Sequence, residues 1–362
     1  MEPNSEGQIP ISGARINLRI DKYQQFPVTY QKEASGTETD PQAENVDIAI
    51  NKNLPVGSIA GSAAVSSSGS ATYDFSIYTP PGTNGMVPKI GVYYNSSSAD
   101  GLLGRGWNIS GISAITRVPK TLYHNGAIEN IKLDATDPIS LDGNRLIATA
   151  ASGATTFRPE KENFSLITSM TDNGIEYFLV QTKDGLKMEY GKNVDSRLVL
   201  KDGSNADQTL TWYLNKVSDN YGNYMTYSYN NSEGEVTLKE IAYTGNIGFA
   251  PYNFIRFYYD KRQDENTSYL NGNALKNSLI VREIEVFCEG KSMKRYKFNY
   301  VFNLQSFLRE ISEYGADNTH FNSTFFNYGA GNSTIIESLR EDITPTGGNS
   351  GTNDPVFSAG PM

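Results

Sequence analysis

The sequence predicts an all-β protein built from antiparallel hairpins. Apolar residues alternate with polar ones along many short runs, turn dipeptides separate these runs, and helical periodicity is nearly absent. A period of two puts every second side chain on one face of a strand, whereas a helix repeats its apolar face about every 3.6 residues. Aromatic residues make up 11% of the chain, and their large side chains suit broad, half-buried sheets.

Residues 1–55 are predicted to form an N-terminal tail or linker, disordered or extended. Residues 14–20 can form a short strand, but the polar run 31–45 cannot bury enough apolar surface to order itself. The first clear alternation is Tyr73, Phe75 and Ile77. A Pro- and Gly-rich turn then leads to a second predicted strand at 89–94.

Further strands follow with a turn signal between them. Leu186, Met188 and Tyr190 alternate with charged residues, which is typical of a strand with one buried face. Asp-Gly and related pairs supply the positive φ angles that tight hairpins need. These pairs lie at 142–143, 172–174, 184–185, 221–223 and 289–290.

Two later segments resemble each other. Each contains an apolar strand, an acidic-Tyr-Gly turn and an aromatic strand. The predicted turn residues are Asp219, Tyr221 and Gly222 in the first segment, and Glu313, Tyr314 and Gly315 in the second. Hairpins repeated in this way can stack into an extended sheet. Residues 331–362 return to Gly, Ser, Thr and Asn, and we interpret them as a linker to a missing downstream domain.

Composition and charge exclude several classes of protein. The net charge of −9 does not suit a general nucleic-acid surface, because phosphates need cations to neutralise them. One cysteine, Cys288, allows no intrachain disulfide. No apolar run is long enough to cross a bilayer as a helix. The first residues show neither the basic region nor the apolar core of a signal peptide, so we expect none in this chain.

Catalytic and metal-binding patterns are scarce, and we predict no enzyme activity, no cofactor and no metal site. The two histidines, His124 and His320, are far apart in sequence, and both are interpreted as solvated loop residues. Two acidic groups lack the spacing of a calcium loop, so solvated turn carboxylates are favoured over a Ca²⁺ site. These groups are Asp134, Asp137 and Asp142, and Asp202 and Asp207.

A glycine-rich run surrounds Trp107. Gly101, Gly104 and Gly106 allow close backbone packing or positive φ beside this large side chain. We therefore favour a buried tryptophan in a β corner. The alternative is an exposed sugar-binding platform.

The same region carries a recognisable signature. Its residues are Pro80, Gly82, Gly85, Pro88, Asn95, Ser96, Gly101, Gly104, Gly106, Trp107, Arg117, Asp142 and Gly143. The signature resembles the N-terminal domain family of the Salmonella plasmid virulence protein B, which also opens the B components of insecticidal Tc toxins and many Rhs proteins. The resemblance covers about residues 56–329, and the two Tyr-Gly hairpins are similar to the YD repeats of Rhs proteins.

This resemblance implies a structural role. Residues 56–200 would form the virulence-protein-like β domain, and 201–330 would form YD-repeat-like hairpins of a curved sheet, part of a shell. The chain would be a non-catalytic segment of a secreted or surface toxin, enclosing or presenting a toxic cargo. Its expected partners are downstream shell or propeller domains and the cargo, in the same or a partner chain. The ADP-ribosyltransferase of the Salmonella protein lies in a separate domain and is not implied.

A surface adhesin or carbohydrate-binding module is the alternative. It would use exposed tyrosines, such as Tyr221, Tyr224 and Tyr227, as platforms for a glycan or a cell-surface receptor. An undetected hydrolase is the third hypothesis, although no motif in the sequence indicates one.

Overall fold

The computed structural model describes residues 9–11, 14–19, 61–149 and 156–328. Within these ranges the chain is almost entirely antiparallel β structure, which confirms the predicted fold class. The exceptions are one short helix, α1 (Leu122–Asn125), and two 3₁₀ turns, η1 (Thr83–Gly85) and η2 (Val194–Ser196). In this described part of the chain, no helix is long and apolar enough to span a membrane. The polar run 31–45 and the predicted linker 331–362 lie outside the described residues.

A small four-stranded sheet is formed by the first part of the signature region. Its strands, in spatial order, are β3 (Gly61–Val65), β4 (Ala71–Ser76), β5 (Gly91–Asn95) and β8 (Trp107–Ser110). Strands β5 and β8 pair directly, and the chain between them forms a separate two-stranded ribbon of β6 (Asp100–Gly101) and β7 (Gly104–Arg105). The alternation predicted for Tyr73, Phe75 and Ile77 places all three side chains in the core.

The next strands close into a ring. They are β9 (Ala114–Arg117), β10 (Ile139–Leu141), β11 (Asn144–Ala148), β12 (Thr156–Pro159), β13 (Leu166–Asp172), β14 (Ile175–Gln181), β15 (Lys187–Tyr190) and β17 (Asp207–Ser218). Each pairs with the next, and β17 pairs with both β15 and β9. Gly191 N donates to Tyr213 O, whereas Leu214 N donates to Ser113 O. The backbone N–H and C=O groups of successive residues in a strand point to opposite edges of that strand. Tyr213 and Leu214 are successive residues, so β15 and β9 flank β17 on different sides.

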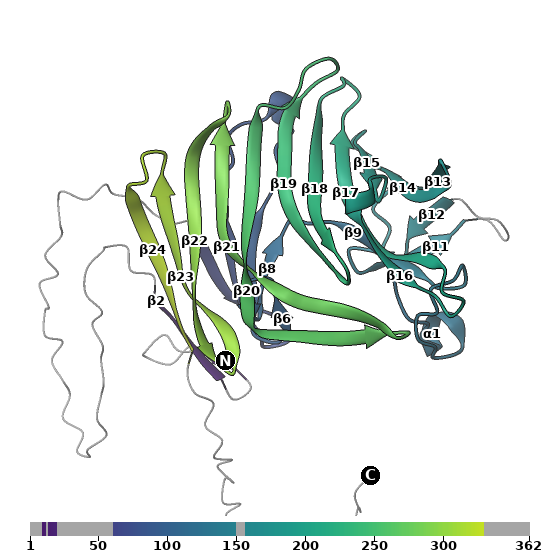
Figure 1. Ribbon diagram of the computed structural model, residues 1–362, viewed down its shortest axis with the longest axis horizontal. Helices are drawn as coiled ribbons and strands as arrows, with labels where there is room; N and C mark the ends of the chain where they lie inside the picture. Colours follow the sequence, from purple (N-terminus) through teal and green to yellow (C-terminus); the bar gives the residue numbers. More distant parts are fainter. Residues whose placement is uncertain (1–8, 12–13, 20–60, 150–155, 329–362) are drawn as a thin grey trace, which may run out of the picture.

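Strand β17 also begins a second, long sheet. Its N-terminal half pairs with β16 (Arg197–Lys201), and its last residues pair with β18. The sheet then runs through β18 (Tyr224–Ser232), β19 (Glu235–Gly245), β20 (Asn253–Leu270), β21 (Asn273–Cys288), β22 (Lys291–Asn303), β23 (Gln305–Gly315) and β24 (His320–Tyr328). Beyond β24 lie β2 (Ala14–Arg19), within the predicted strand at 14–20, and β1 (Ile9–Ile11). Figure 1 shows β17 to β24 side by side.

The hairpin of β20 and β21 bends out of the long sheet and forms an arm that reaches toward α1 (Figure 1). The pairing register shifts between Lys261 and Asn266, where the bend occurs. At the tip, Asn271 Nδ2 donates to Ile131 O at 3.0 Å. A separate apolar cluster holds the arm against the ring, and it consists of Leu133, Leu200 and Leu210 packed with Ile131, Leu198, Leu270 and Leu275.

A buried ion pair fixes the bend of this arm. The guanidinium of Arg262 binds the carboxylate of Asp264 through two hydrogen bonds. Nε donates to Oδ1 and Nη2 donates to Oδ2, each at 3.1 Å. The third, Nη1, donates to Gly101 O and to Asn277 Oδ1, each at 2.9 Å. Asp264 also accepts from the backbone N and the hydroxyl of Ser306. The pair therefore connects β20 with β6, β21 and β23.

Replacing Arg262 should destabilise the protein strongly. Arg262→Met leaves the carboxylate of Asp264 buried without its cation, and loss of one partner of such a pair costs about 3–5 kcal/mol. Urea unfolding measures this change. The neighbouring variant Lys261→Met removes an exposed side chain and should cost less than about 0.5 kcal/mol. Similar losses for the two variants would contradict the structural role assigned to Arg262.

Stability should also fall in acid because of Asp264. Burial raises the pKa of this carboxyl, but the hydrogen bonds from Arg262 and Ser306 outweigh burial and hold the pKa below its ordinary value of 3.8. A lowered folded-state pKa adds stability above the unfolded-state pKa, and that stability is lost as the pH falls below it. We expect Asp264→Asn to reduce the difference in urea midpoint between neutral pH and about pH 3. An unchanged difference would contradict this assignment.

Candidate functional site

Trp107 lies at the centre of the contact between the small sheet and the last strands of the long sheet. Its side chain is 1% exposed, and its ring packs on Tyr73, Tyr94 and Phe326 at centroid distances of 6.0, 5.0 and 4.6 Å. The indole Nε1 donates to Tyr328 Oη at 2.7 Å. Trp107 is therefore buried, as the sequence predicted. The alternative of a sugar-binding platform is wrong, because a sugar cannot reach this ring.

Tyr328 continues this contact into the long sheet. Burial raises the pKa of Tyr328, so its hydroxyl remains protonated. It can therefore accept from Trp107 and at the same time donate to Leu308 O, at 2.7 Å. The chain of hydrogen bonds joins β8, β24 and β23, which are distant in sequence.

The glycines beside Trp107 permit this close approach. Gly106 has a φ of +75°, and a Cβ built on it would lie 2.7 Å from Tyr94 Cε2 and 2.8 Å from Asn95 O. Gly104 has a φ of +89°, and a Cβ there would collide with the backbone carbonyl of Ser306. A side chain at either position would separate the ribbon from β5 or from β23.

Other signature residues shape the turns around the small sheet. Pro80 O accepts from Tyr243 Oη at 3.0 Å, which attaches the turn to β19. Asn95 Oδ1 accepts from Ser97 N, and Ser96 Oγ accepts from Ala71 N. Gly82, Gly85 and Pro88 lie in the connection between β4 and β5, which contains η1.

Arg117 organises the loop between β9 and β10. This side chain is buried, and it donates to Thr209 O at 2.8 Å and to Asp134 O. Its Nη1 lies 3.7 Å from Asp137 Oδ2, and its Cζ lies 5.4 Å from the ring centre of Trp212. Arg117 thus connects three segments of the ring.

The carboxylates of Asp137 and Asp142 accept hydrogen bonds from backbone N–H groups, and Asp134 accepts from Thr136 N and Oγ1. Asp137 accepts from the backbone N of Lys132, Leu133 and Asp134. Asp142 accepts from Ser113 Oγ and Ala114 N, which fixes the start of β9. The predicted turn at 142–143 is present, with positive φ at both residues. Asp137 is buried, so it is not the solvated carboxylate expected from sequence.

The two predicted YD-like turns differ. In the first, Asp219 accepts from Tyr221 N, Asn223 N and Asn223 Nδ2, and Gly222 has a φ of +83°. The second differs from the prediction, because Glu313, Tyr314 and Gly315 end strand β23 and do not form a turn. Here the turn follows at 316–319, where Asp317 accepts from Thr319 N and Asn318 provides the positive φ.

The predicted tyrosine platform is not formed. Tyr221 is 79% exposed at its turn, but Tyr227 is 6% exposed and faces the core, where its hydroxyl contacts Met225 Sδ. Tyr224 lies between these extremes and donates to Phe249 O at 3.3 Å. The three rings therefore do not share one exposed face.

Neither histidine is a freely solvated loop residue. His124 lies in α1, with Nδ1 2.8 Å from Thr121 Oγ1 and Nε2 3.0 Å from Glu160 Oε1. His320 begins β24, and its ring packs on Tyr314 at 5.1 Å. Its Nε2 lies 2.9 Å from Ser323 Oγ.

Ser323 and His320 differ from a hydrolytic triad in the position of the acid. Glu310 Oε1 lies 2.7 Å from Ser323 Oγ, so the carboxylate contacts the serine itself. In a triad, the acid binds the histidine nitrogen that faces away from the serine. Ser323 is also 3% exposed, which leaves it inaccessible to a substrate.

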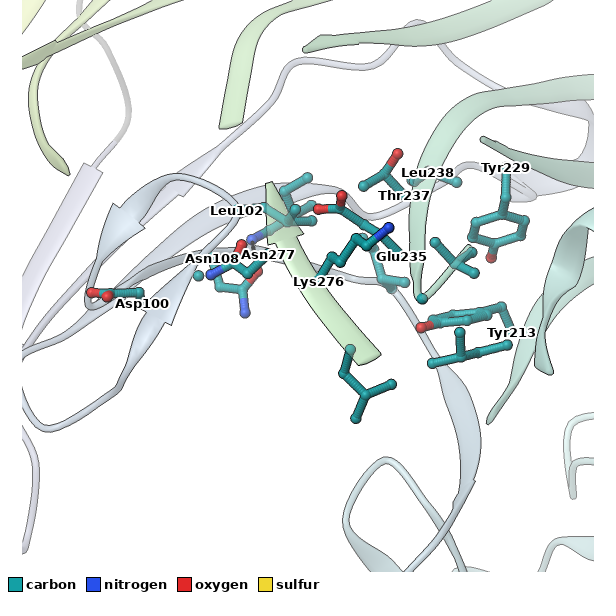
Figure 2. A pocket seen from close by; sticks show the side chains of 17 residues that line it. Asp100, Leu102, Asn108, Tyr213, Tyr229, Glu235, Thr237, Leu238, Lys276 and Asn277 are labelled. Carbon is teal, nitrogen blue, oxygen red and sulfur yellow. Dashed lines mark hydrogen bonds between the residues drawn. The ribbon is translucent and has the colours of Figure 1, made fainter. Parts of the chain in front are cut away.

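A cavity of about 530 Å³ lies where β6–β8, β17–β19 and the arm meet (Figure 2). Tyr213, Glu235, Lys276 and Asn277 contribute polar groups to its lining. Glu235 accepts from Ser278 N, Ser278 Oγ and Leu279 N, so its carboxylate is already engaged. Burial raises the pKa of Tyr213 to about 12. Sequence reasoning missed this cavity because its walls come from segments far apart in the chain.

Gly106→Ala should destabilise the contact between the sheets. An alanine at this positive φ costs about 1–2 kcal/mol of folding free energy. Displacing Tyr94 and Asn95 away from the added methyl group costs about 1–3 kcal/mol more. Gly143→Ala is the matched control, because Gly143 has a φ of +79° but nothing within 4 Å of the added methyl group. Urea unfolding compares the two variants. Equal destabilisation would show that close packing at Gly106 contributes nothing.

Comparison with solved structures gives the fold. The N-terminal domain of the effector protein SpvB from Salmonella typhimurium strain LT2 is 17% identical, with a TM-score of 0.54, over 67% of this chain and 99% of that one. The TcdB2-TccC3 structure is 15% identical, with a TM-score of 0.61, over 82% of this chain and 17% of that one. The Photorhabdus luminescens Tc holotoxin pore matches at 17% identity and a TM-score of 0.58, over 74% of this chain and 16% of that one.

Comparison with sequence families gives the identity of the chain. None of the curated proteins matches it in a sequence search. The model of the family described as Salmonella virulence plasmid 65kDa B protein (SpvB) matches residues 65–126 and 145–311, which is more than half of the chain. These ranges include Trp107 and its glycines, the closing strand of the ring and most of the long sheet. The chain therefore belongs to the SpvB family.

Proposed function

We propose that this chain is a non-catalytic structural segment of a secreted or surface toxin of the Rhs and Tc type. It forms part of a β shell that encloses or presents a toxic cargo. Membership of the SpvB family supports a toxin-associated role. The chain also matches only 17% of the TcdB2-TccC3 chain, which is consistent with one segment of a much larger assembly.

One observation carries this proposal, namely that the signature residues serve packing. Trp107, Gly104 and Gly106 attach the small sheet to β23 and β24, while Arg117 and Asp142 organise the ring. None of these side chains is presented to a substrate as a nucleophile or a general base. These residues fix the relative positions of the small sheet, the ring and the long sheet. A wall that encloses a cargo must keep such a fixed shape.

Open sheet edges support the proposed partners. Strand β3 pairs with β4 on one side, and no described strand pairs with its other edge. Unpaired backbone groups at such an edge can accept a further strand. Downstream shell or propeller domains, and the cargo, are the partners that we propose, in the same polypeptide or in a partner chain.

The size of the natural polypeptide is the first test. An antibody against this segment should detect a product far larger than 39.9 kDa in the producing cells. In that product, limited proteolysis should leave the cargo region intact, because the shell excludes the protease. Gly106→Ala should expose the cargo, whereas Gly143→Ala should not. A natural product close to 39.9 kDa would contradict enclosure by this chain.

A further inference from the structure

A groove of about 620 Å³ lies at the end of the long sheet where β17 turns into β18. Its floor is the outward face of β15, β17 and β18. Lys187 lies opposite Ser218, and Lys216 lies opposite Thr226, so these side chains share one face of the sheet. The loop 246–250, between β19 and β20, forms the wall.

The floor carries positive charge that the described part of the chain neutralises only in part. Neither Lys187 nor Lys216 has an acidic group within ion-pair distance among the described residues, although Lys216 Nζ lies 5.1 Å from the ring centre of Tyr224. Glu189, opposite Lys216, pairs with Lys192. Asp219 also lines the groove, and its carboxylate, which accepts from its own turn, offsets one of the two positive charges and leaves the lining with a net positive charge. In a chain with a net charge of −9, this is a local reversal of sign.

Large apolar side chains surround the groove and point into solvent. Tyr221, Ile247 and Phe249 are 79%, 78% and 74% exposed. Exposed apolar patches beside polar groups are typical of interaction sites, because leaving such side chains in water has a cost that a partner can remove. The combination of two lysines without an acidic partner and an apolar rim predicts a partner that is both acidic and apolar.

The loops that present these side chains are held in place. Asn246 Nδ2 donates to Asn223 Oδ1 at 2.7 Å, and Asn246 and Phe249 form an isolated β-bridge. Tyr224 Oη donates to Phe249 O at 3.3 Å. The groove is therefore preformed, so binding requires little ordering of the protein.

We propose that this groove binds an acidic segment of a partner polypeptide. A carboxylate of the partner would lie between Lys187 and Lys216, and adjacent apolar side chains would cover Ile247 and Phe249. The wall formed by loop 246–250 beside the two lysines favours a polypeptide over a membrane, because a side chain can enter between this wall and the sheet and a flat layer of headgroups cannot.

Fluorescence anisotropy with the full chain and two libraries of short synthetic peptides tests this proposal. One library fixes Asp or Glu beside Phe or Leu, and the matched library carries Lys at the acidic positions. We expect binding of the acidic library alone, weakening as salt is added. Lys187→Glu and Phe249→Ser should each weaken binding roughly tenfold, as truncation of an anchoring contact does.

The matched controls are Lys239→Glu, at another exposed lysine, and Leu304→Ser, at a turn where the side chain is 87% exposed. Both should leave peptide binding unchanged. Equal binding of the two libraries, or equal effects of groove and control variants, would overturn the proposal. Concentration-dependent dimers lost in Phe249→Ser would assign the groove to a second copy instead. Binding only to vesicles of anionic lipid would assign it to a membrane.

Discussion

The described structure depends on one aromatic contact, the packing of Trp107 between the small sheet and the end of the long sheet. The hydrogen bond from its indole to Tyr328 joins residues 221 positions apart. Closing so long a loop has an unfavourable conformational entropy. The favourable free energy from burying apolar surface at the contact must exceed it. Tyr73, Tyr94 and Phe326 supply this burial around the indole. The glycines of the signature are needed because the backbones must approach closely enough for the rings to meet.

The arm introduces a second constraint, which is electrostatic. A hairpin as long as β20–β21 would continue straight in the plane of the sheet if its register were uninterrupted. The register shift instead buries Arg262 and Asp264, and a buried ion pair is stable only when its remaining donors and acceptors are satisfied. Gly101, Asn277 and Ser306 satisfy them. The pair thereby specifies the direction of the arm, and the leucine cluster at its tip then attaches the arm to the ring.

These two constraints explain what the signature residues do in the fold. The signature residues lie where segments distant in sequence must meet, so they determine shape. The groove near Lys187 and Lys216 is different, because neither lysine has an acidic group within ion-pair distance among the described residues, and Ile247 and Phe249 remain largely exposed. In the structural role that we propose, the chain acts through its partners, and surfaces with unpaired charge and exposed apolar area are where partners bind.

The sequence by itself determined the all-β class, the hairpin turns at Asp142 and Gly222, the burial of Trp107 and membership of the family. These depend on local periodicity, on glycines at positive φ and on a contiguous motif. Only the tertiary structure decided that β17 closes a ring, that Tyr227 faces the core, and that Glu313 belongs to a strand. It also brought Lys187 beside Lys216 and formed the cavity at Tyr213. The physical reason is that strand pairing acts between distant segments, and which face of a strand is buried depends on its neighbours.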